Sequence, residues 1–237
     1  MKRRPTQKTD PRTFWNAEYK THEHFALSYT VSEELEHFAR YLERNHAGVP
    51  RGLHVLDVGC GNGRNIAWLA RTYGASGAGF DFADSAIEDA RERAQGLPIV
   101  FRTQDIHNPF PEQNATYDIV IDFMVSHVLT GKDRETYLRE VHRVLKPGGW
   151  FILKTLLRDD DAHAERMLAE TQGKGEGVYV HPRTGGVEYA GTEKALTNEY
   201  SNYFLVEKKQ KSHAHRVHGK PNKRRFIVFY LVKVKIL

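Results

Sequence analysis

The sequence predicts an α/β fold with a mainly parallel central sheet. Three observations support this prediction: short β-rich runs alternate with amphipathic helical segments, a glycine-rich turn follows the first such run, and acidic residues follow later runs. Strands that alternate with helices form right-handed βαβ units, in which the strands lie parallel. The chain of 237 residues is long enough to bury one such sheet together with an attachment.

An N-terminal extension is expected before the sheet. Residues 1–12 are basic and lack an apolar stretch, so we predict a disordered tail there. Residues 13–48 are predicted to form a helical extension, in which apolar residues from Leu35 to Leu42 recur at helical spacing. Ser32 stands where a helix N-cap is expected. The remaining residues, 49–237, are assigned to one domain.

The elements of this domain follow in order. Strands are predicted at 53–58, 76–80, 98–102, 117–123 and 150–156, and helices at 64–73, 85–95 and 134–145. The turn from Lys146 to Gly149 ends the last of these helices. Residues 158–191 show no clean period and are too many for a passive connection, so we predict a lid over an active site. A helix from Thr192 and two β-rich runs, 203–207 and 226–234, close the chain.

Charge and cysteine content limit the class of protein. The formal net charge is +5, and basic residues gather between 207 and 235, which favours an anionic partner. Cys60 is the single cysteine, so neither an intrachain disulfide nor a cysteine zinc cluster can form. The histidines at 213, 215 and 218 do not match a zinc-finger spacing, and no metal site is predicted. No apolar run approaches the roughly 20 residues of a membrane span, and we expect a cytoplasmic location, with a nuclear one left open.

The glycine-rich turn is the strongest local signal of a ligand. Asp57-Val58-Gly59-Cys60-Gly61-Asn62-Gly63 lies directly after a predicted strand and directly before a predicted helix. Glycines let the backbone turn tightly and approach a ligand, and the helix N-terminus points free N–H groups at the same space. Arg64 replaces the last glycine of the dinucleotide-binding pattern. The turn therefore suits a nucleoside with an uncharged linker better than a pyrophosphate.

Two acidic residues stand where a nucleoside is bound in such sheets. Asp81 ends the second strand about twenty residues beyond the turn, where a carboxylate accepts hydrogen bonds from ribose hydroxyls. It fits NAD and S-adenosylmethionine equally. Asp105, followed by Ile106, comes after the third strand and could accept from an adenine amino group. The alternative for Asp105 is a turn cap.

Five motifs in register resemble the class I S-adenosylmethionine-dependent methyltransferases. They are DVGCGNG, GFD, QDIHNPFP, YDIVIDFMVSHVL and LREVHRVLKPGGWFIL, and the resemblance covers roughly residues 50 to 157. It implies a Rossmann-like three-layer sandwich with a seven-stranded, mostly parallel sheet and an antiparallel last strand. It also implies methyl transfer, with S-adenosyl-L-methionine as the cofactor.

The resemblance implies roles for individual residues. Asp57, Gly59 and Gly61 would line the methionine end of the cofactor, and Asp122 would lie beside the reacting sulfonium. The full set of expected cofactor contacts is Asp57, Gly59, Cys60, Gly61, Asn62, Gly63, Asp81, Phe82, Asp105, Ile106, Asp122, Phe123 and Met124. The fourth strand ends in Asp122-Phe123-Met124 and lacks the N/D-P-P-Y/F motif of many enzymes that methylate amino groups of DNA and proteins. This departure argues against that subclass.

Aromatic residues and a histidine complete the candidate site. Trp15 and Tyr19 are candidates to cover the cofactor, although packing of the N-terminal helix onto the sheet is the favoured explanation of both. His127 follows the fourth strand and is the candidate general base. Its alternative role is packing or hydrogen bonding at a helix start. Cys60 is interpreted as a small residue that fills the tight turn.

The acceptor is predicted less sharply than the cofactor. If the last two strands form an antiparallel hairpin, their basic loop lies at the carboxyl edge of the sheet, where ligands bind. Arg216, Lys223 and Arg224 would then border the substrate mouth and attract an anionic acceptor. A small molecule is favoured, and RNA bound by the loop 208–225 is the alternative. An NAD-dependent oxidoreductase and a non-catalytic nucleotide-binding module remain as other classes.

Overall fold

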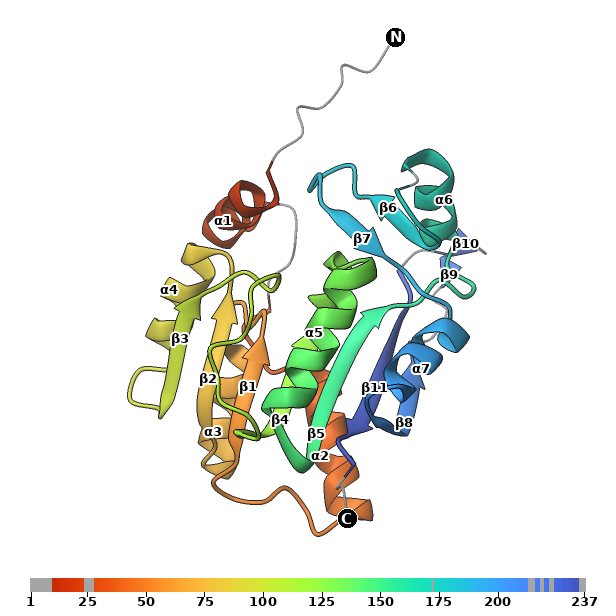
Figure 1. Ribbon diagram of the computed structural model, residues 1–237. Helices are drawn as coiled ribbons and strands as arrows, with labels where there is room; N and C mark the ends of the chain where they lie inside the picture. The colour runs from red at the N-terminus through yellow and green to blue at the C-terminus, as the bar shows by residue number, and fades with distance from the viewer. Residues whose placement is uncertain are drawn as a thin grey trace.

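The central feature of the protein is a seven-stranded sheet in the order β3-β2-β1-β4-β5-β11-β8 (Figure 1). The computed structural model describes residues 10–23, 28–171, 173–212, 216–217, 220–221 and 224–234. The strands of the sheet are β1 (His54–Val58), β2 (Ser76–Asp81), β3 (Ile99–Thr103), β4 (Tyr117–Phe123), β5 (Leu145–Leu156), β8 (Leu205–Lys211) and β11 (Phe226–Val232). Strands β1 to β5 pair in parallel, and β11 is antiparallel to both of its neighbours. The predicted fold class is confirmed.

The observed strands lie within one or two residues of their predicted bounds, except at the start of β5 and the end of β8. Strand β5 begins at Leu145, five residues earlier than expected, because the turn from Lys146 to Gly149 is drawn into the sheet where the register with β4 shifts. Strand β8 begins two residues later than expected, because Tyr203 closes a turn onto Tyr200 after the preceding helix. Its charged sequence, LVEKKQK, has no apolar face and suits the edge position that β8 occupies.

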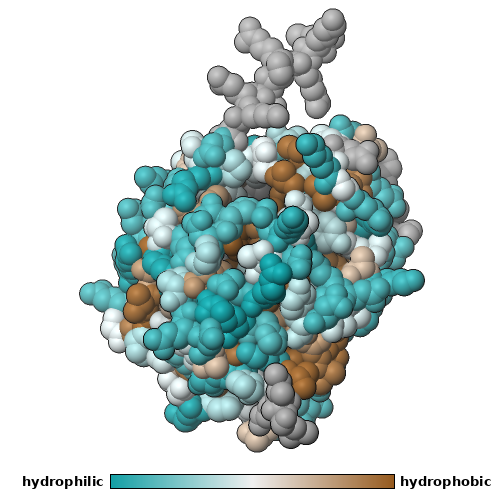
Figure 2. All heavy atoms as spheres, in the orientation of Figure 1, coloured by the Kyte–Doolittle hydropathy of each residue, from teal (hydrophilic) through white to brown (hydrophobic). Residues whose placement is uncertain are grey.

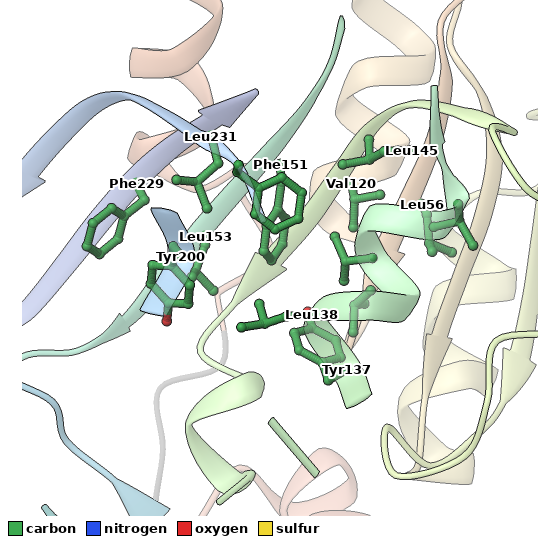
Figure 3. Packing of buried hydrophobic residues seen from close by; sticks show 14 of the residues in the cluster. Leu56, Val120, Tyr137, Leu138, Leu145, Phe151, Leu153, Tyr200, Phe229 and Leu231 are labelled. Carbon is green, nitrogen blue, oxygen red and sulfur yellow. The ribbon is translucent and has the colours of Figure 1, made fainter. Parts of the chain in front are cut away.

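Helices cover both faces of the sheet and bury two separate cores. One face packs against α2 (Glu33–Asn45), α3 (Arg64–Tyr73) and α4 (Asp84–Arg93), through side chains such as Phe38 and Ile66. The other face packs against α5 (Gly131–Val144) and α7 (Glu193–Ser201). Figure 3 shows Tyr137 of α5 and Tyr200 of α7 beside Phe151 and Phe229 of the sheet. This gives the three layers that the sequence predicts.

The start of α2 differs in one detail from the prediction. Ser32 occupies the N-cap position, but its side chain makes no capping hydrogen bond. Its backbone N–H instead donates to Oδ1 of Asn65 on α3, over 3.0 Å. Acidic side chains in the first turn of α2 compensate, because carboxylates stabilise a helix N-terminus.

The N-terminal helix α1 (Pro11–Thr21) begins earlier than expected. Asp10 caps it by accepting from the backbone N–H of Thr13 over 3.0 Å, and Pro11 fits the first turn. The predicted disordered tail is therefore wrong for residues 10–12, while residues 1–9 lie outside the described residues. The helix is fixed on the start of α4, where Oδ1 of Asn16 accepts from the backbone N–H of Ser85 over 3.1 Å.

The segment 158–191 contains regular elements that its sequence does not reveal. These are α6 (Ala162–Thr171) and the hairpin of β6 (Val178–Val180) with β7 (Val187–Tyr189). Asp161 starts α6 by accepting from the backbone N–H of His163 over 2.8 Å. Both strands are three residues long, which is too short for a detectable period. In Figure 1, α1 and the β6–β7 hairpin both lie at the carboxyl end of the parallel strands.

Three smaller elements complete the described chain. The 3-10 helix η1 (Ser126–Val128) follows β4, and β9 (Arg216–Val217) pairs with β10 (Lys220–Pro221) between β8 and β11. The face of the molecule in Figure 2 is mainly hydrophilic, with smaller apolar patches. Within the residues that the structure describes, no helix is both long and apolar enough to cross a membrane.

Arg134 of α5 joins α7, η1 and β7. Its guanidinium is 5% exposed and bonds both carboxylate oxygens of Glu199 on α7, at 2.9 and 2.7 Å. It also donates to the backbone oxygen of Ser126 over 2.8 Å and lies over the ring of Tyr189. Arg134 therefore ties η1 and β7 to the helical layer.

We predict that Arg134→Ala lowers the free energy of unfolding by about 3–5 kcal/mol, because it leaves a partly buried carboxylate and a backbone carbonyl without their partner. Arg139→Ala on the same helix removes an exposed pair with Glu135 and an exposed hydrogen bond to Thr136, and should change the free energy of unfolding by at most about 0.5 kcal/mol. Urea unfolding of both variants measures the difference. Equal losses in the two variants would contradict this role of Arg134.

Candidate active site

A cavity of about 600 Å³ opens at the carboxyl end of the parallel strands. Its wall combines α1, the turns after β1, β2, β3 and β4, and the segment around β7. The lining residues that bear on its chemistry are Arg12, Trp15, Tyr19, Gly59, Asp81, Phe82, Asp105, Ile106, Phe123, Met124, His127 and Glu188. Segments far apart in the sequence therefore meet in one cavity of the size typical of small-molecule sites, about 300–1,000 Å³.

The turn after β1 needs glycine at the positions nearest the cavity. Gly59 and Gly61 have φ angles of 60° and 53°, in the left-handed region that glycine adopts without strain. A Cβ on Gly59 would collide with the side chain of Val125, and one on Gly61 would meet the hydroxyl of Tyr19. Gly59 lines the cavity directly, whereas Gly61 lies beneath Tyr19.

The other predicted contacts of this turn support it from outside the cavity. Cys60 is buried in the core under the turn, where burial raises the pKa of its thiol. Asn62 donates to the backbone oxygen of Ser28 over 3.1 Å, and Gly63 caps α3 against Phe101. These three residues are not among those that line the cavity, and their expected contacts with a cofactor stay a prediction. The interpretation of Cys60 as a residue that fills the turn agrees with this structure.

Two of the predicted acidic residues lie beneath the cavity. Asp57 is 2% exposed, and no hydrogen bond within the described residues reaches its Oδ2. Burial raises the pKa of Asp57 to about 7. Asp122 is fully buried, accepts from the backbone N–H of Val125 over 3.0 Å and from the hydroxyl of Tyr137 over 2.8 Å. Asp122 therefore lies outside the cavity lining and caps the chain after β4, and its expected place beside the reacting sulfonium stays a prediction.

The carboxylate of Asp81 lies in the cavity wall, as predicted. Its Oδ2 accepts from the backbone N–H of Gly61 over 3.1 Å, and its Oδ1 accepts from that of Ala83 over 3.0 Å. Burial raises its pKa to about 6, although these backbone hydrogen bonds oppose the rise. Each oxygen retains capacity for a further hydrogen bond. Phe82 follows it in the wall.

Asp105, in the segment after β3, caps a turn and also lines the cavity, so its expected contact with an adenine stays a prediction. Its Oδ1 accepts from the backbone N–H of His107 over 3.0 Å, which is a turn cap, and Asp105 also lines the cavity beside Ile106. Burial alone would raise the pKa of Asp105, but the hydrogen bonds and charge of His107 lower it below its usual value. The carboxylate therefore stays ionised at the cavity mouth.

Helix α1 places its aromatic side chains against the cavity. Trp15 and Tyr19 line it with their rings 6.2 Å apart, and neither belongs to the two cores on the faces of the sheet. The favoured explanation, packing onto the sheet, is therefore wrong. It is α2 that packs there, so α1 remains available to cover the cavity.

His127 lines the opposite part of the cavity, near a carboxylate that the sequence analysis missed. Its Nε2 lies 3.9 Å from Oε1 of Glu188 on β7, and the two residues are 8% and 7% exposed. Burial lowers the pKa of His127 to about 4, so the imidazole is neutral. Glu188 was missed because a three-residue strand in an aperiodic segment gives no signal of its place.

The basic residues predicted at the substrate mouth, Arg216, Lys223 and Arg224, are only partly described by the structure. The one side chain among them that is described, that of Arg224, is engaged in hydrogen bonds. Arg224 donates to Glu188 over 2.8 Å and also to the hydroxyl of Tyr179. Arg225 beside it is bonded to the backbone and side chains of the segment 159–161. The prediction that Arg224 is a free cation at the substrate mouth is therefore wrong, because the carboxylate of Glu188 binds its guanidinium. Only the backbone of Arg216 is described, and Lys223 lies outside the described residues.

Comparison with known proteins identifies several methyltransferases as relatives. A family model described as "Methyltransferase domain" matches residues 55–149. The fatty-acid O-methyltransferase of Mycolicibacterium smegmatis is 33% identical over 168 residues, which cover 69% of this chain and 60% of that protein. A ubiquinone biosynthesis O-methyltransferase of Bordetella avium is 34% identical over 116 residues, which cover 48% and 46%. The chain thus matches less than two thirds of the length of these relatives.

Solved structures share the fold. A protein from Methanosarcina mazei, described as an S-adenosylmethionine-dependent methyltransferase, superposes with a TM-score of 0.66 at 23% identity, over 78% of this chain and 94% of that chain. The N-methyltransferase NodS of Bradyrhizobium japonicum, solved with S-adenosylhomocysteine, superposes with a TM-score of 0.65 at 14% identity, over 95% and 100%. At these identities the likeness concerns the fold.

We predict that Gly59→Ala destabilises the protein more than Gly74→Ala. Both positions have a left-handed backbone, but a Cβ on Gly74 meets open space, whereas one on Gly59 meets Val125. The clash should add about 1–3 kcal/mol to the shared backbone strain. Urea unfolding measures both losses, and Val125→Ala added to Gly59→Ala should recover part of the difference. Equal losses would contradict the close approach.

We predict that Asp57→Asn raises Tm at mildly alkaline pH. Because burial raises the folded-state pKa of Asp57 to about 7, the folded protein binds more protons than the unfolded one, and stability falls as pH rises toward 7. Asparagine removes this loss, with about 2–4 °C expected for each kcal/mol gained. Thermal unfolding across a pH series tests this, with exposed Glu88→Gln as the control. A gain that persists undiminished at acidic pH would contradict the explanation.

Proposed function

The chain belongs to the class I S-adenosylmethionine-dependent methyltransferases, a family of enzymes, and from this premise we propose that it transfers a methyl group to a small molecule bound in the cavity. The observation that carries the proposal is the meeting of Gly59, Asp81 and Ile106 in one wall of that cavity. These are the positions at which the family resemblance expects the methionine, ribose and adenine parts of S-adenosylmethionine.

The residues present fit this cofactor. Asp81 offers two carboxylate oxygens to the two ribose hydroxyls, and Asp105 and Ile106 lie where the adenine is expected. Gly59 has no side chain, so the methionine part of the cofactor can pass close to the backbone there. The unpartnered Oδ2 of Asp57 lies beneath the turn and suits an ammonium group reached through it. Trp15 and Tyr19 would cover the bound cofactor and exclude water.

The cofactor, when bound, supplies a methyl group attached to a positively charged sulfur. A nucleophile of the acceptor attacks this methyl group in line and displaces the sulfur. The protein then has to align the acceptor and remove its proton. Phe123, Met124 and His127 line the same cavity as Glu188 of β7, and we place the acceptor among them. We assign the segment 158–191, which supplies Glu188, the role of a lid that closes on the acceptor.

A small-molecule acceptor is favoured over RNA by two observations. The relatives whose names specify a substrate or pathway include a fatty-acid O-methyltransferase and ubiquinone biosynthesis O-methyltransferases. The cavity is bounded by α1 on one side and by β7 on the other, and Arg224 of the basic loop is held by Glu188. Arg224 is therefore not one of the free cations that an RNA acceptor would need.

Calorimetric titration with S-adenosylmethionine, S-adenosylhomocysteine and NAD(H) tests the cofactor. We predict binding of the first two and not of NAD(H), with Asp81→Asn weakening it about 10- to 100-fold, because a hydrogen bond to a charged group contributes about 1.5–3 kcal/mol. Asp84→Asn, next to the same turn but exposed, is the control. Affinity should also fall as pH drops below about 6, because protonated Asp81 is the poorer acceptor.

Binding of NAD(H) in place of the methyl donor would contradict the proposal. Binding of S-adenosylmethionine that is unaffected by Asp81→Asn would contradict the assigned role of this carboxylate. Methyl transfer is then assayed with radiolabelled donor on a panel of small hydroxyl compounds, carboxylates and RNA. Transfer to RNA alone would overturn the choice of acceptor class.

A further inference from the structure

We propose that His127 and Glu188 hold the hydroxyl group of a neutral acceptor between them, with His127 donating a hydrogen bond to its oxygen and Glu188 taking its proton. This inference rests on the proposed function and narrows it to O-methylation of an alcohol or phenol. The sequence analysis placed the general base at His127, whereas the surroundings of the two side chains assign that role to Glu188.

The distance between the two side chains leaves room for one atom. Nε2 of His127 and Oε1 of Glu188 are 3.9 Å apart, which is too long for a direct hydrogen bond. A single oxygen can lie about 2.8 Å from both. Both side chains line the cavity, and both are more than nine-tenths buried, so the position is part of the cavity and shielded from bulk water.

Glu188 is held so that one oxygen remains available. Its Oε2 accepts from the hydroxyl of Tyr179 and from the guanidinium of Arg224, each over 2.8 Å. Tyr179 is fully buried, which fixes the carboxylate in place. No hydrogen bond from the described residues reaches Oε1, which faces His127. The carboxylate is therefore a preorganised acceptor for one proton-bearing group of a ligand.

The charges decide which of the two residues accepts a proton. Burial raises the pKa of Glu188, but the charge of Arg224 and the hydrogen bonds from Tyr179 and Arg224 oppose this rise and favour the ionised carboxylate. Burial together with Arg224, Arg134 and His181 disfavours protonated His127, although Glu188 opposes this. A neutral imidazole next to an anion carries its proton on the nitrogen facing that anion, here Nε2. His127 is then a donor, and Glu188 is the acceptor.

The chemical step balances with these two residues. The acceptor oxygen forms a bond to the methyl carbon, the carbon–sulfur bond breaks, and its electron pair stays on sulfur. The hydroxyl proton passes to Oε1 of Glu188, leaving a methyl ether, S-adenosylhomocysteine and a neutral carboxylic acid that later releases its proton. An oxygen that gains a methyl group becomes strongly acidic before it loses its proton. A weakly basic carboxylate is therefore sufficient.

The same arrangement selects against charged acceptors. An ionised carboxylate at Oε1 repels a second carboxylate in a buried site, and the nearby Arg224 is already engaged. A hydroxyl satisfies both residues, since it donates once and accepts once. We therefore infer that neutral hydroxyl compounds bind in preference to carboxylic acids of the same shape.

The first test uses phenol and benzoate as matched probes on the protein saturated with S-adenosylhomocysteine. Nitrogen NMR of His127 should show the Nε2–H tautomer, and millimolar phenol should perturb its signals more strongly than benzoate does. Glu188→Gln should bring the benzoate affinity up toward that of phenol, because the repulsion is lost. An Nδ1–H tautomer, no response to phenol, or equal affinities in the wild type would overturn the inference.

The second test separates the two roles by methyl transfer from S-adenosylmethionine to phenol. Glu188→Gln should lower kcat about 100-fold or more, while His127→Gln, which keeps an N–H donor, should lower it far less. Glu188→Asp should recover part of the rate. A larger loss of kcat in His127→Gln than in Glu188→Gln would overturn the assignment. So would a wild type that binds phenol but forms no anisole, the methyl ether of phenol. Binding of S-adenosylhomocysteine is measured by calorimetry for the wild type and each variant. If the wild type does not bind it, the proposed function itself is refuted. If binding is present, a failure of the methyl-transfer test concerns the acceptor site alone.

Discussion

The hydrogen bonds of Asp81 are the contacts on which the cofactor side of the cavity depends. One carboxylate oxygen holds the turn after β1 at Gly61, and the other holds the start of the turn after β2 at Ala83. In a parallel sheet these two turns emerge side by side at the carboxyl edge, and nothing in the strand pairing fixes their shape. A buried carboxylate that accepts from both backbones does so, at the cost of a raised pKa.

The acceptor side of the cavity depends on contacts made from the opposite direction. Arg134 joins η1 to α7 and lies over Tyr189, next to Glu188 on β7. Arg224, at the end of the loop before β11, then holds the carboxylate of Glu188. The cofactor side is therefore built by the sheet edge, whereas the acceptor side is built by an insertion fastened to it through two arginines. Under the proposed function, this division would let one fold keep a cofactor and change its substrate.

The sequence predicted the sheet well, and it placed Gly59 and Asp81 at the edge where the cavity lies, because both leave local signals. Alternating apolar runs marked the strands, and the glycines and Asp81 stand at fixed places relative to those strands. The acceptor side left no such signal. Glu188 lies on a strand of three residues, and its importance comes from His127, sixty-one positions earlier in the chain. The family resemblance implied a place for Asp122 beside the sulfonium, whereas a buried carboxylate at a strand end can equally cap the following turn, as it does here.

The N-terminal helix shows the same limit of local reasoning. The aromatic residues of α1 were expected on the sheet, but the sheet face is already covered by α2, and only the three-dimensional arrangement shows this. The basic loop is a further case, because its charge is visible in the sequence while the pairing of Arg224 with Glu188 is not. Charge counts describe which ligands a surface could attract, and they do not show which charges are already neutralised.

The most direct test of this account is the crystal structure of the protein with S-adenosylhomocysteine. We expect the ribose hydroxyls on Asp81, the adenine beside Ile106, and the sulfur directed toward the space between Phe123 and His127. A nucleoside bound with its ribose away from Asp81, or a sulfur that faces away from His127 and Glu188, would contradict the account.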